Sequence, residues 1–187
     1  MKVEKGVFTT AATARLAGLS PVVSQQTVVL ILGSFPGVKS LEFGRYYAHP
    51  QNHFWKILQA VWPTHPIPPA SEPFAARAEW LLVRGLGVWD VYAACEREGS
   101  LDSAIRDAAV NDFGALDLPR LGAVAHNGAE SFRHSQHVVD AFAVARPASA
   151  PSLPVYKLPS TSPANASWSF DRKLEAWRDV FVRHGIA

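Results

Sequence analysis

One stretch of the sequence, GRYYAHPQNHFWKIL from Gly44 to Leu58, gathers aromatic rings and hydrogen-bonding side chains in a short span. It holds two tyrosines, two histidines, an asparagine and a tryptophan directly ahead of a predicted helix. A segment that only fills a core does not carry so many polar groups, because each buried polar group needs a partner. The residue types therefore indicate a ligand site, with aromatic packing beneath the helix as the alternative.

Two other motifs follow apolar runs of strand type. GSFPG (Gly33–Gly37) is a glycine-flanked turn that could present backbone N–H groups to a ligand or a phosphate, or could be a tight exit from the strand. It matches neither the dinucleotide fingerprint nor the P-loop, which disfavours both kinds of nucleotide binding. Asp90 follows the second run, and its carboxylate could accept a hydrogen bond from a ligand N–H, orient water, or cap a turn.

LPSTSPANAS, from Leu158 to Ser167, offers small hydroxyl groups without bulky neighbours. Ser160, Thr161 and Ser162 could hydrogen-bond a phosphate, or could form a turn that caps the last helix.

The histidines and the single cysteine of the sequence give little indication of a metal site or of a reactive thiol. His49 and His53 are four residues apart, and His134 and His137 are three apart, but neither pair has a nearby third ligand in the sequence. Metal ligation needs that third ligand and a supporting shell, so we expect no metal site. Cys95 lacks an evident base partner, which favours an inert thiol.

The elements that must position these residues alternate between strands and helices. We predict strands at 27–33, 86–91 and 155–158, a strand followed by a turn at 122–128, helices at about 52–62, 74–83, 129–141 and 169–184, and a short helix near 112–118. This alternation predicts an α/β fold, a three-layer α/β/α sandwich around a short, mainly parallel four-stranded sheet. Ligands of such sheets bind beyond the carboxyl ends of the strands, and the segments just past the four predicted strands are GSFPG, WDVYAAC, HNGAES and LPSTSPANAS.

The composition indicates one globular domain. Of 187 residues 48% are hydrophobic and 18% are charged, and the net charge of +2 is only a mild bias toward polyanions. We expect residues 1–25 to be a loosely ordered lead-in and 26–187 to be the domain. A single cysteine, no signal-peptide core and no apolar run long enough for a bilayer predict a cytoplasmic protein without membrane contact.

Taken together, ILGSFPG, YYAHPQNHFWKIL, LGVWDV, HNGAESF and LPSTSPANA resemble the uracil-DNA glycosylase superfamily, over about residues 27–181. The resemblance is strongest to its hypoxanthine-DNA (deoxyinosine) glycosylases, with the mismatch-specific uracil and thymine enzymes next. It implies a monomer that flips a deaminated base out of DNA and hydrolyses the bond between base and sugar, without a metal or organic cofactor.

Two departures narrow this expectation. Mismatch-specific relatives carry a water-positioning asparagine in the turn where Phe35 stands, and classical uracil enzymes carry a histidine where Leu158 stands. In the hypoxanthine branch the catalytic asparagine lies in the Pro-x-Asn-x-Phe-Trp segment, which matches Asn52. The resemblance thus implies that Asn52 orients the attacking water and favours deoxyinosine as substrate.

Flipping chemistry assigns roles to the other candidates. Tyr47 is expected to stack on the base with Tyr46 and Phe35 as neighbours, and Asp90 to accept the N–H of its six-membered ring. The backbone N–H groups of Gly33–Phe35, including that of Ser34, are expected to stabilise the leaving ring. The predicted DNA contacts are small side chains and turns: Lys39, Ser40, Asn127, Gly128, Ser160, Thr161, Ser162, Pro163 and Ala164. Specificity for uracil or another deaminated base, a non-catalytic DNA- or nucleotide-binding role and an unrelated α/β hydrolase remain alternatives.

Overall fold

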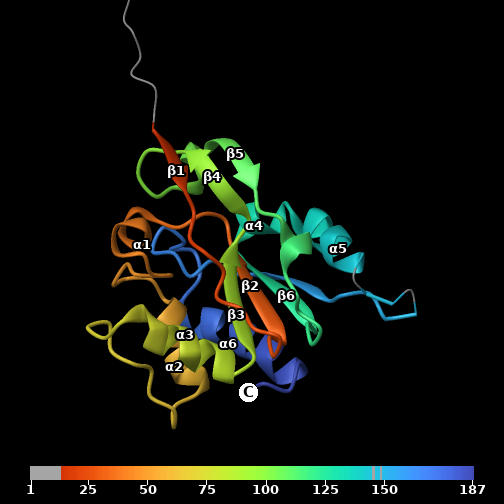
Figure 1. Cartoon of the computed structure of the whole chain (residues 1–187). Helices are drawn as coiled ribbons and strands as arrows, with labels where there is room; N and C mark the ends of the chain where they lie inside the picture. Colours follow the sequence, from red (N-terminus) through yellow and green to blue (C-terminus); the bar gives the residue numbers. More distant parts are fainter. Residues whose placement is uncertain (1–13, 145, 148) are drawn as a thin grey trace, which may run out of the picture.

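A parallel sheet of four strands lies at the centre of the protein, which a computed structural model describes for residues 14–144, 146–147 and 149–187 (Figure 1). The strands are β2 (Val29–Gly33), β3 (Leu86–Asp90), β6 (Ala123–Asn127) and β7 (Val155–Leu158), in the order β3-β2-β6-β7. Every residue of β2 and β3 is buried, as their continuous apolar runs predict for strands covered on both faces.

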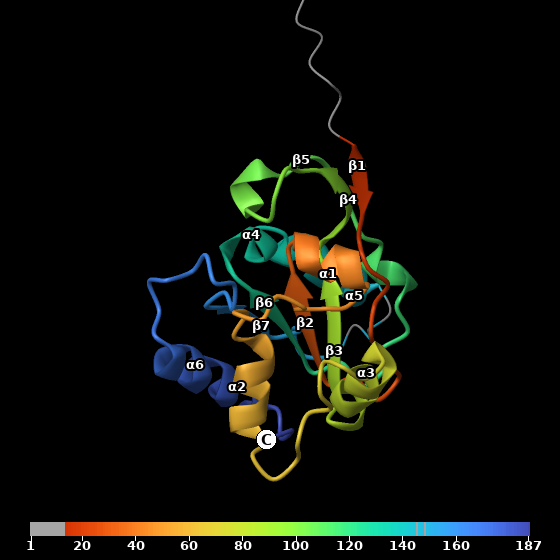
Figure 2. The same cartoon turned by 90° about the vertical axis from the view of Figure 1, so that its left-hand side faces the viewer.

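Helices cover both faces of this sheet (Figure 2). On one side lie α2 (Phe54–Val61), α3 (Phe74–Val83) and α6 (Phe170–Arg183), and on the other α4 (Ala129–Phe132) and α5 (Ser135–Ala143). The short helix α1 (Val38–Phe43) follows β2. The arrangement confirms the predicted three-layer sandwich, with α3 and β7 at the predicted residues.

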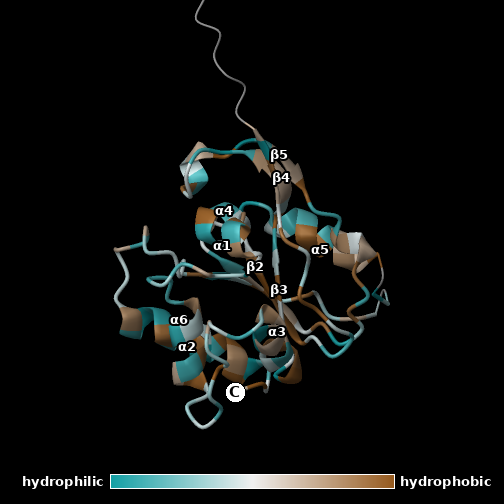
Figure 3. Cartoon of the chain, turned by 60° about the vertical axis from the view of Figure 1, so that its left-hand side comes forward, coloured by the Kyte–Doolittle hydropathy of each residue, from teal (hydrophilic) through white to brown (hydrophobic). Residues whose placement is uncertain are grey.

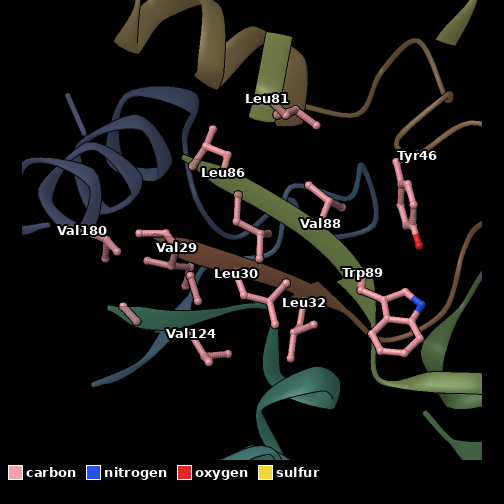
Figure 4. Close-up of a cluster of buried hydrophobic side chains, with 14 of the residues drawn as sticks. Val29, Leu30, Leu32, Tyr46, Leu81, Leu86, Val88, Trp89, Val124 and Val180 are labelled. Carbon is pink, nitrogen blue, oxygen red and sulfur yellow. The ribbon is translucent and has the colours of Figure 1, made fainter. Parts of the chain in front are cut away.

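The core is formed by side chains that alternate along the strands. Leu81 of α3 and Val88 lie on one face of the sheet, whereas Leu32 and Val124 point toward the other (Figure 4). Hydrophobic residues line these central strands, and the loops are largely hydrophilic (Figure 3). Among the described helices, none is both long and apolar enough to cross a membrane.

A second, antiparallel sheet lies beyond the carboxyl ends of the parallel strands (Figure 1). It consists of β1 (Arg15–Ala17), β4 (Tyr92–Glu96) and β5 (Arg106–Val110), in the order β1-β4-β5. Two 3-10 turns, η1 (Asp102–Ala104) and η2 (Phe113–Ala115), lie on either side of β5. The sequence predicts only a polar loop for β4, because its YAACE run is poor in the β-branched and aromatic residues that mark strands.

Part of the N-terminal segment also differs from its prediction. β1 pairs with β4, and Val22 and Val88 exchange two backbone hydrogen bonds of 2.9 Å. Residues 14–25 are therefore held against the domain, unlike the loose lead-in that their composition predicts. Residues 1–13 lie outside the described part of the chain.

Candidate active site

A cavity of about 560 Å³ opens where the parallel strands end. All but one of the candidate residues from the sequence line it: Gly33, Ser34, Phe35, Lys39, Ser40, Tyr47, Asn52, Asp90, Asn127, Ser160, Thr161, Ser162, Pro163 and Ala164. The exception, Gly128, begins α4 with a φ of +107°, and a Cβ there would lie 3.1 Å from the Ser160 side chain. The structure thus brings the separate motifs together in space, as the rule for strand ends predicts.

Strand register aims three of these residues in one direction. Gly33 pairs with Asp90 across the parallel ladder, and Leu32 pairs with His126, one residue before Asn127. Because side chains alternate along a strand, Gly33, Asp90 and Asn127 share one face of the sheet. Tyr47 lies on that face, where its hydroxyl accepts a hydrogen bond from Asn127 Nδ2 at 3.2 Å.

Asp90 carries a buried carboxylate on the cavity wall. The residue is 4% exposed, and its Oδ2 is buried without a hydrogen-bond partner among the described residues. Burial raises the pKa of Asp90 to about 7; nearby Arg97 opposes this rise and Asp102 adds to it. A carboxylate that keeps an oxygen free in such a place is poised to accept from a ligand donor.

Gly33 makes room for that carboxylate. A Cβ at this position would lie 2.3 Å from Asp90 Oδ1 and 3.7 Å from the Tyr47 hydroxyl. Any larger residue would collide with the acid, so the glycine of the turn is required by close approach.

Tyr47 is half-buried and adopts a left-handed backbone with a φ of +53°. Its ring stacks on Phe54 with centroids 3.8 Å apart and planes inclined by 18°. A tyrosine with positive φ is strained, so the surrounding contacts must hold it there. The ring also lines the cavity, where part of its surface is open to a ligand.

The two other aromatic candidates near the cavity are buried. Tyr46 is 3% exposed, and its hydroxyl lies 3.2 Å from the carbonyl oxygens of Leu19 and Ser20. Phe35 is 6% exposed and packs under the Arg97 guanidinium at 5.0 Å. Both rings line the cavity but expose little of their surface.

Asn52 stands at the entrance of α2, half-buried and on the cavity wall. Its backbone N–H donates to the His49 carbonyl, and its side-chain oxygen accepts from the Phe54 N–H, both at 2.9 Å. The side chain is therefore held against Phe54, the first residue of the helix. Its amide N–H groups and the second lone pair of its oxygen remain available.

The Ser160–Ala164 loop is a turn built by its own hydroxyls. Ser160 Oγ accepts from the Ser162 N–H at 3.2 Å, and Ser162 Oγ accepts from the Ala164 N–H at 3.3 Å. Thr161 is fully buried; its Oγ1 accepts from Asn127 Nδ2 at 2.9 Å, and its N–H donates to Asn127 Oδ1 at 2.8 Å. Asn127 therefore positions this loop together with Tyr47.

Helix α6 anchors the same loop from outside the cavity. The buried Lys173 ammonium donates to the Asn165 carbonyl at 2.8 Å, and Trp177 Nε1 donates to the Pro159 carbonyl at 3.1 Å. Burial lowers the pKa of Lys173.

Across the cavity, Lys39 is exposed and ion-paired with Glu42 at 2.8 Å, whereas Ser40 is buried and accepts from the Ala48 N–H at 3.3 Å. Of these two predicted DNA contacts, only Lys39 presents an exposed polar group.

The structure adds residues that the sequence did not indicate. Ser100, Leu101, Asp102 and Ser103, from the loop between β4 and β5, line the cavity, as does Asn165. Asp102 accepts a hydrogen bond of 2.5 Å from the Ser34 hydroxyl. A polar run after a strand is the only sequence signal for this loop, because the second sheet that carries it was not predicted.

Neither histidine pair belongs to a cluster of potential metal ligands in the described residues. No group of three histidine, cysteine, aspartate or glutamate side chains there could hold one ion. His53 packs edge-on against Phe170, and His134 accepts from or donates to the Tyr92 hydroxyl at 2.8 Å. Cys95 is buried.

Comparison with known proteins finds similarity both in sequence and in structure. Residues 20–181 match the family model "Uracil DNA glycosylase superfamily". A hypoxanthine DNA glycosylase of Methanosarcina acetivorans is 32% identical over 171 residues, which cover 89% of this chain and 98% of the relative. One of Methanosarcina barkeri is 38% identical over 116 residues, which cover 61% of this chain and 72% of the relative. The solution NMR structure of a Methanosarcina acetivorans protein ascribed to the uracil DNA glycosylases covers 92% of this chain and 99% of its own, with a TM-score of 0.71 and 29% identity.

Proposed function

We propose that this chain, a DNA glycosylase that belongs to the uracil DNA glycosylase superfamily, excises hypoxanthine from deoxyinosine in DNA by hydrolysis. The observation that carries the proposal is the buried, unpartnered oxygen of Asp90 in a cavity shared with Asn52 and Tyr47. Two relatives named hypoxanthine DNA glycosylase support the choice of base.

The cavity suits an everted base. Its volume of about 560 Å³ falls within the range of small-molecule sites, and it can hold a purine. A base inside a duplex hides its glycosidic bond, so the enzyme must flip the nucleotide at a cost of a few kcal/mol. Stacking on Tyr47 returns about 1–3 kcal/mol of that cost.

Asp90 would read the edge of the base. Ionised, it accepts from the N1–H of hypoxanthine, whereas adenine presents an acceptor at the same position and is repelled. Guanine also carries an N1–H, so its exclusion must have another source. Its stronger pairing with cytosine supplies one, because flipping costs least for damaged or mismatched bases.

Asn52 would place the water. Its hydrogen bond to the Phe54 N–H fixes the side chain, which leaves the second lone pair of Oδ1 to orient a water molecule toward C1′ of the sugar. The water oxygen forms a bond to C1′ while the bond from C1′ to N9 breaks, through a transition state of oxocarbenium character. The base leaves with the electron pair of that bond; the water releases one proton and the departing base takes one up, so the products are the C1′ alcohol of the sugar and neutral hypoxanthine.

The turn after β2 would stabilise the departing ring. The Gly33 and Ser34 carbonyls accept from the Val91 and Tyr92 N–H groups at 2.8 and 3.0 Å, which holds the turn rigid. A rigid turn can keep the backbone N–H groups of residues 33–35 aimed at charge that develops on the purine.

DNA would be gripped by few charges. We assign phosphate contacts to Lys39, Ser160 and Ser162 and to the Asn127–Gly128 turn, with Pro163 and Ala164 pressing beside the flipped base. A protein that neutralises few phosphates shows only a shallow dependence of binding on salt.

The test is an excision assay on duplexes that each carry one inosine, uracil or xanthine, with undamaged duplex as control and released base measured by chromatography. We expect release of hypoxanthine, and a large loss of this release in Asp90→Asn. Release of uracil alone would show that the protein is specific for uracil and not for hypoxanthine. Tight binding of the damaged duplex without release of a base would show a DNA-binding protein without glycosylase activity. Undiminished release by Asp90→Asn would refute the role of the carboxylate.

A further inference from the structure

A buried arginine lies behind the turn that follows β2. Arg97, the residue after β4, is 5% exposed, and its Nη2 donates to the Pro36 carbonyl. Its guanidinium carbon lies 5.0 Å from the centroid of the Phe35 ring. All residues of the Gly33–Gly37 turn line the cavity, whereas Arg97 does not, so the guanidinium contacts the turn from the side that faces away from the ligand.

The Arg97 guanidinium is buried without a direct ion-pair partner. It forms no salt bridge with the described residues, and its Nε and Nη1 are buried without a hydrogen-bond partner among them. A buried charge without a partner is costly, and a hydrocarbon side chain of similar volume would fill the same space at a lower cost. Packing against Phe35 and the bond to Pro36 therefore do not explain why a charged residue stands here.

Two carboxylates lie on the cavity side of the same turn. Asp90 pairs with Gly33 in the sheet, and Asp102 accepts a hydrogen bond of 2.5 Å from the Ser34 hydroxyl. Asp90, like Arg97, is buried and forms no salt bridge with the described residues. The turn thus separates two buried charges of opposite sign. Such charges stabilise each other without direct contact, because a protein interior screens them less than water does.

The other titratable groups around Asp90 carry no positive charge. Tyr46 and Tyr47 come from the segment ahead of α2, and both phenols stay neutral because burial and the charge of Asp90 raise their pKa values. Burial raises the pKa of Asp90; the cation of Arg97 lowers it, and the anion of Asp102 in η1 raises it further. Among these neighbours, Arg97 is therefore the group that favours the ionised carboxylate.

We propose that Arg97 is a positioning residue of the active site, whose buried positive charge keeps Asp90 ionised and ready to accept a hydrogen bond from the base. This inference rests on the proposed role of Asp90 in reading the base, and it assigns a function to a residue outside the cavity. Arg97 acts through Asp90 and does not touch the ligand.

The first test follows the titration of Asp90 without any substrate. In isotope-labelled protein, NMR records the chemical shift of the Asp90 carboxyl carbon against pH, and Asp90→Asn identifies the signal. Arg97→Met removes the charge but keeps a chain that can pack on Phe35, so it should raise the midpoint by about one pH unit. Arg97→Lys keeps the charge and should titrate close to the wild type.

Two further variants make this test decisive. Arg97→Gln removes the charge but keeps a donor for the Pro36 carbonyl, so it should show the same rise as Arg97→Met and replaces that variant if it fails to fold. Arg178→Met is the matched control, because Arg178 is an exposed arginine of α6 that also donates to a backbone carbonyl, that of Ala60. It should leave the midpoint unchanged.

The second test is the pH profile of single-turnover excision of hypoxanthine. Arg97→Met should excise about tenfold more slowly than the wild type at pH 6 and nearly as fast at pH 9, because a raised midpoint matters only below it. An unchanged Asp90 midpoint, or a rate lowered by one factor at every pH, would overturn the inference and leave Arg97 a structural role. Absence of excision by the wild type would instead overturn the proposed function, and the NMR titration would still decide on Arg97.

Discussion

Replacing Asp90 by asparagine distinguishes two effects of the buried charge: its cost to the stability of the fold and its proposed role in binding the base. The carboxyl is 4% exposed, and burial raises its pKa from 3.8 to about 7. Each pH unit between these values is worth about 1.4 kcal/mol, so keeping Asp90 ionised in the folded protein costs about 4 kcal/mol.

The sign of the pH dependence follows from the direction of this shift. The folded protein holds the Asp90 proton more tightly than the unfolded chain does. Its contribution to stability is therefore complete below about pH 4 and is lost as the pH rises through about 7. Asparagine stays neutral and has nearly the same shape, so Asp90→Asn removes the penalty at high pH.

The assay is urea unfolding of the wild type and of Asp90→Asn between pH 5 and pH 8. The variant should gain in free energy of unfolding over the wild type by about 3 kcal/mol across this range, while its excision of hypoxanthine falls. Asp140→Asn is a control at an exposed aspartate of α5 and should show no such trend. A difference between wild type and Asp90→Asn that stays constant with pH would refute the reasoning.

Three more outcomes are expected. The wild-type excision rate should rise with pH through about 7, because only ionised Asp90 accepts the N1–H; a rate that falls over this range in a pH profile would indicate a proton donor instead. Gly33→Ala should lower excision at least tenfold in a single-turnover assay, since its Cβ would lie 2.3 Å from Asp90 Oδ1 and displace the acid. Asn127→Ala should destabilise the protein by about 1–3 kcal/mol in urea unfolding, because it leaves the buried Thr161 N–H without its partner. An unchanged stability would contradict a structural role for the hydrogen bonds between Asn127 and Thr161.

Much of the parallel sheet was predictable because its sequence signals are strong. The buried runs of β2 and β3 and the amphipathic pattern of α6 follow from periodicity alone, and the helix α3 begins and ends where it was predicted. Asp90 lies at the end of such a strand, so its position on the cavity wall followed from the topology, whereas Asn52 and Tyr47 were indicated by their residue types and by the resemblance to a known family.

The second sheet could not be predicted in the same way. β1 has three residues, and β4 and β5 contain several alanines, so local preference does not distinguish them from loops. They form because distant segments pair, and this pairing brings Leu101 and Asp102 to the cavity. The two hydrogen bonds between Asn127 and Thr161 could not be predicted either, because they join residues that only the tertiary fold brings together.

The role of Asn52 is tested most directly by strand cleavage of an inosine-containing duplex after alkali treatment, with wild type and variants at Asn52. Asn52→Ala removes both the acceptor of the Phe54 N–H and the group proposed to hold the water, whereas Asn52→Ser keeps an oxygen that can accept from this N–H but shortens the side chain. Gln51→Ala changes the exposed neighbour and serves as the control. We expect cleavage by the wild type and Gln51→Ala, and a loss of about 100-fold or more in both Asn52 variants. Wild-type cleavage by Asn52→Ala would contradict the central claim that this amide positions the attacking water.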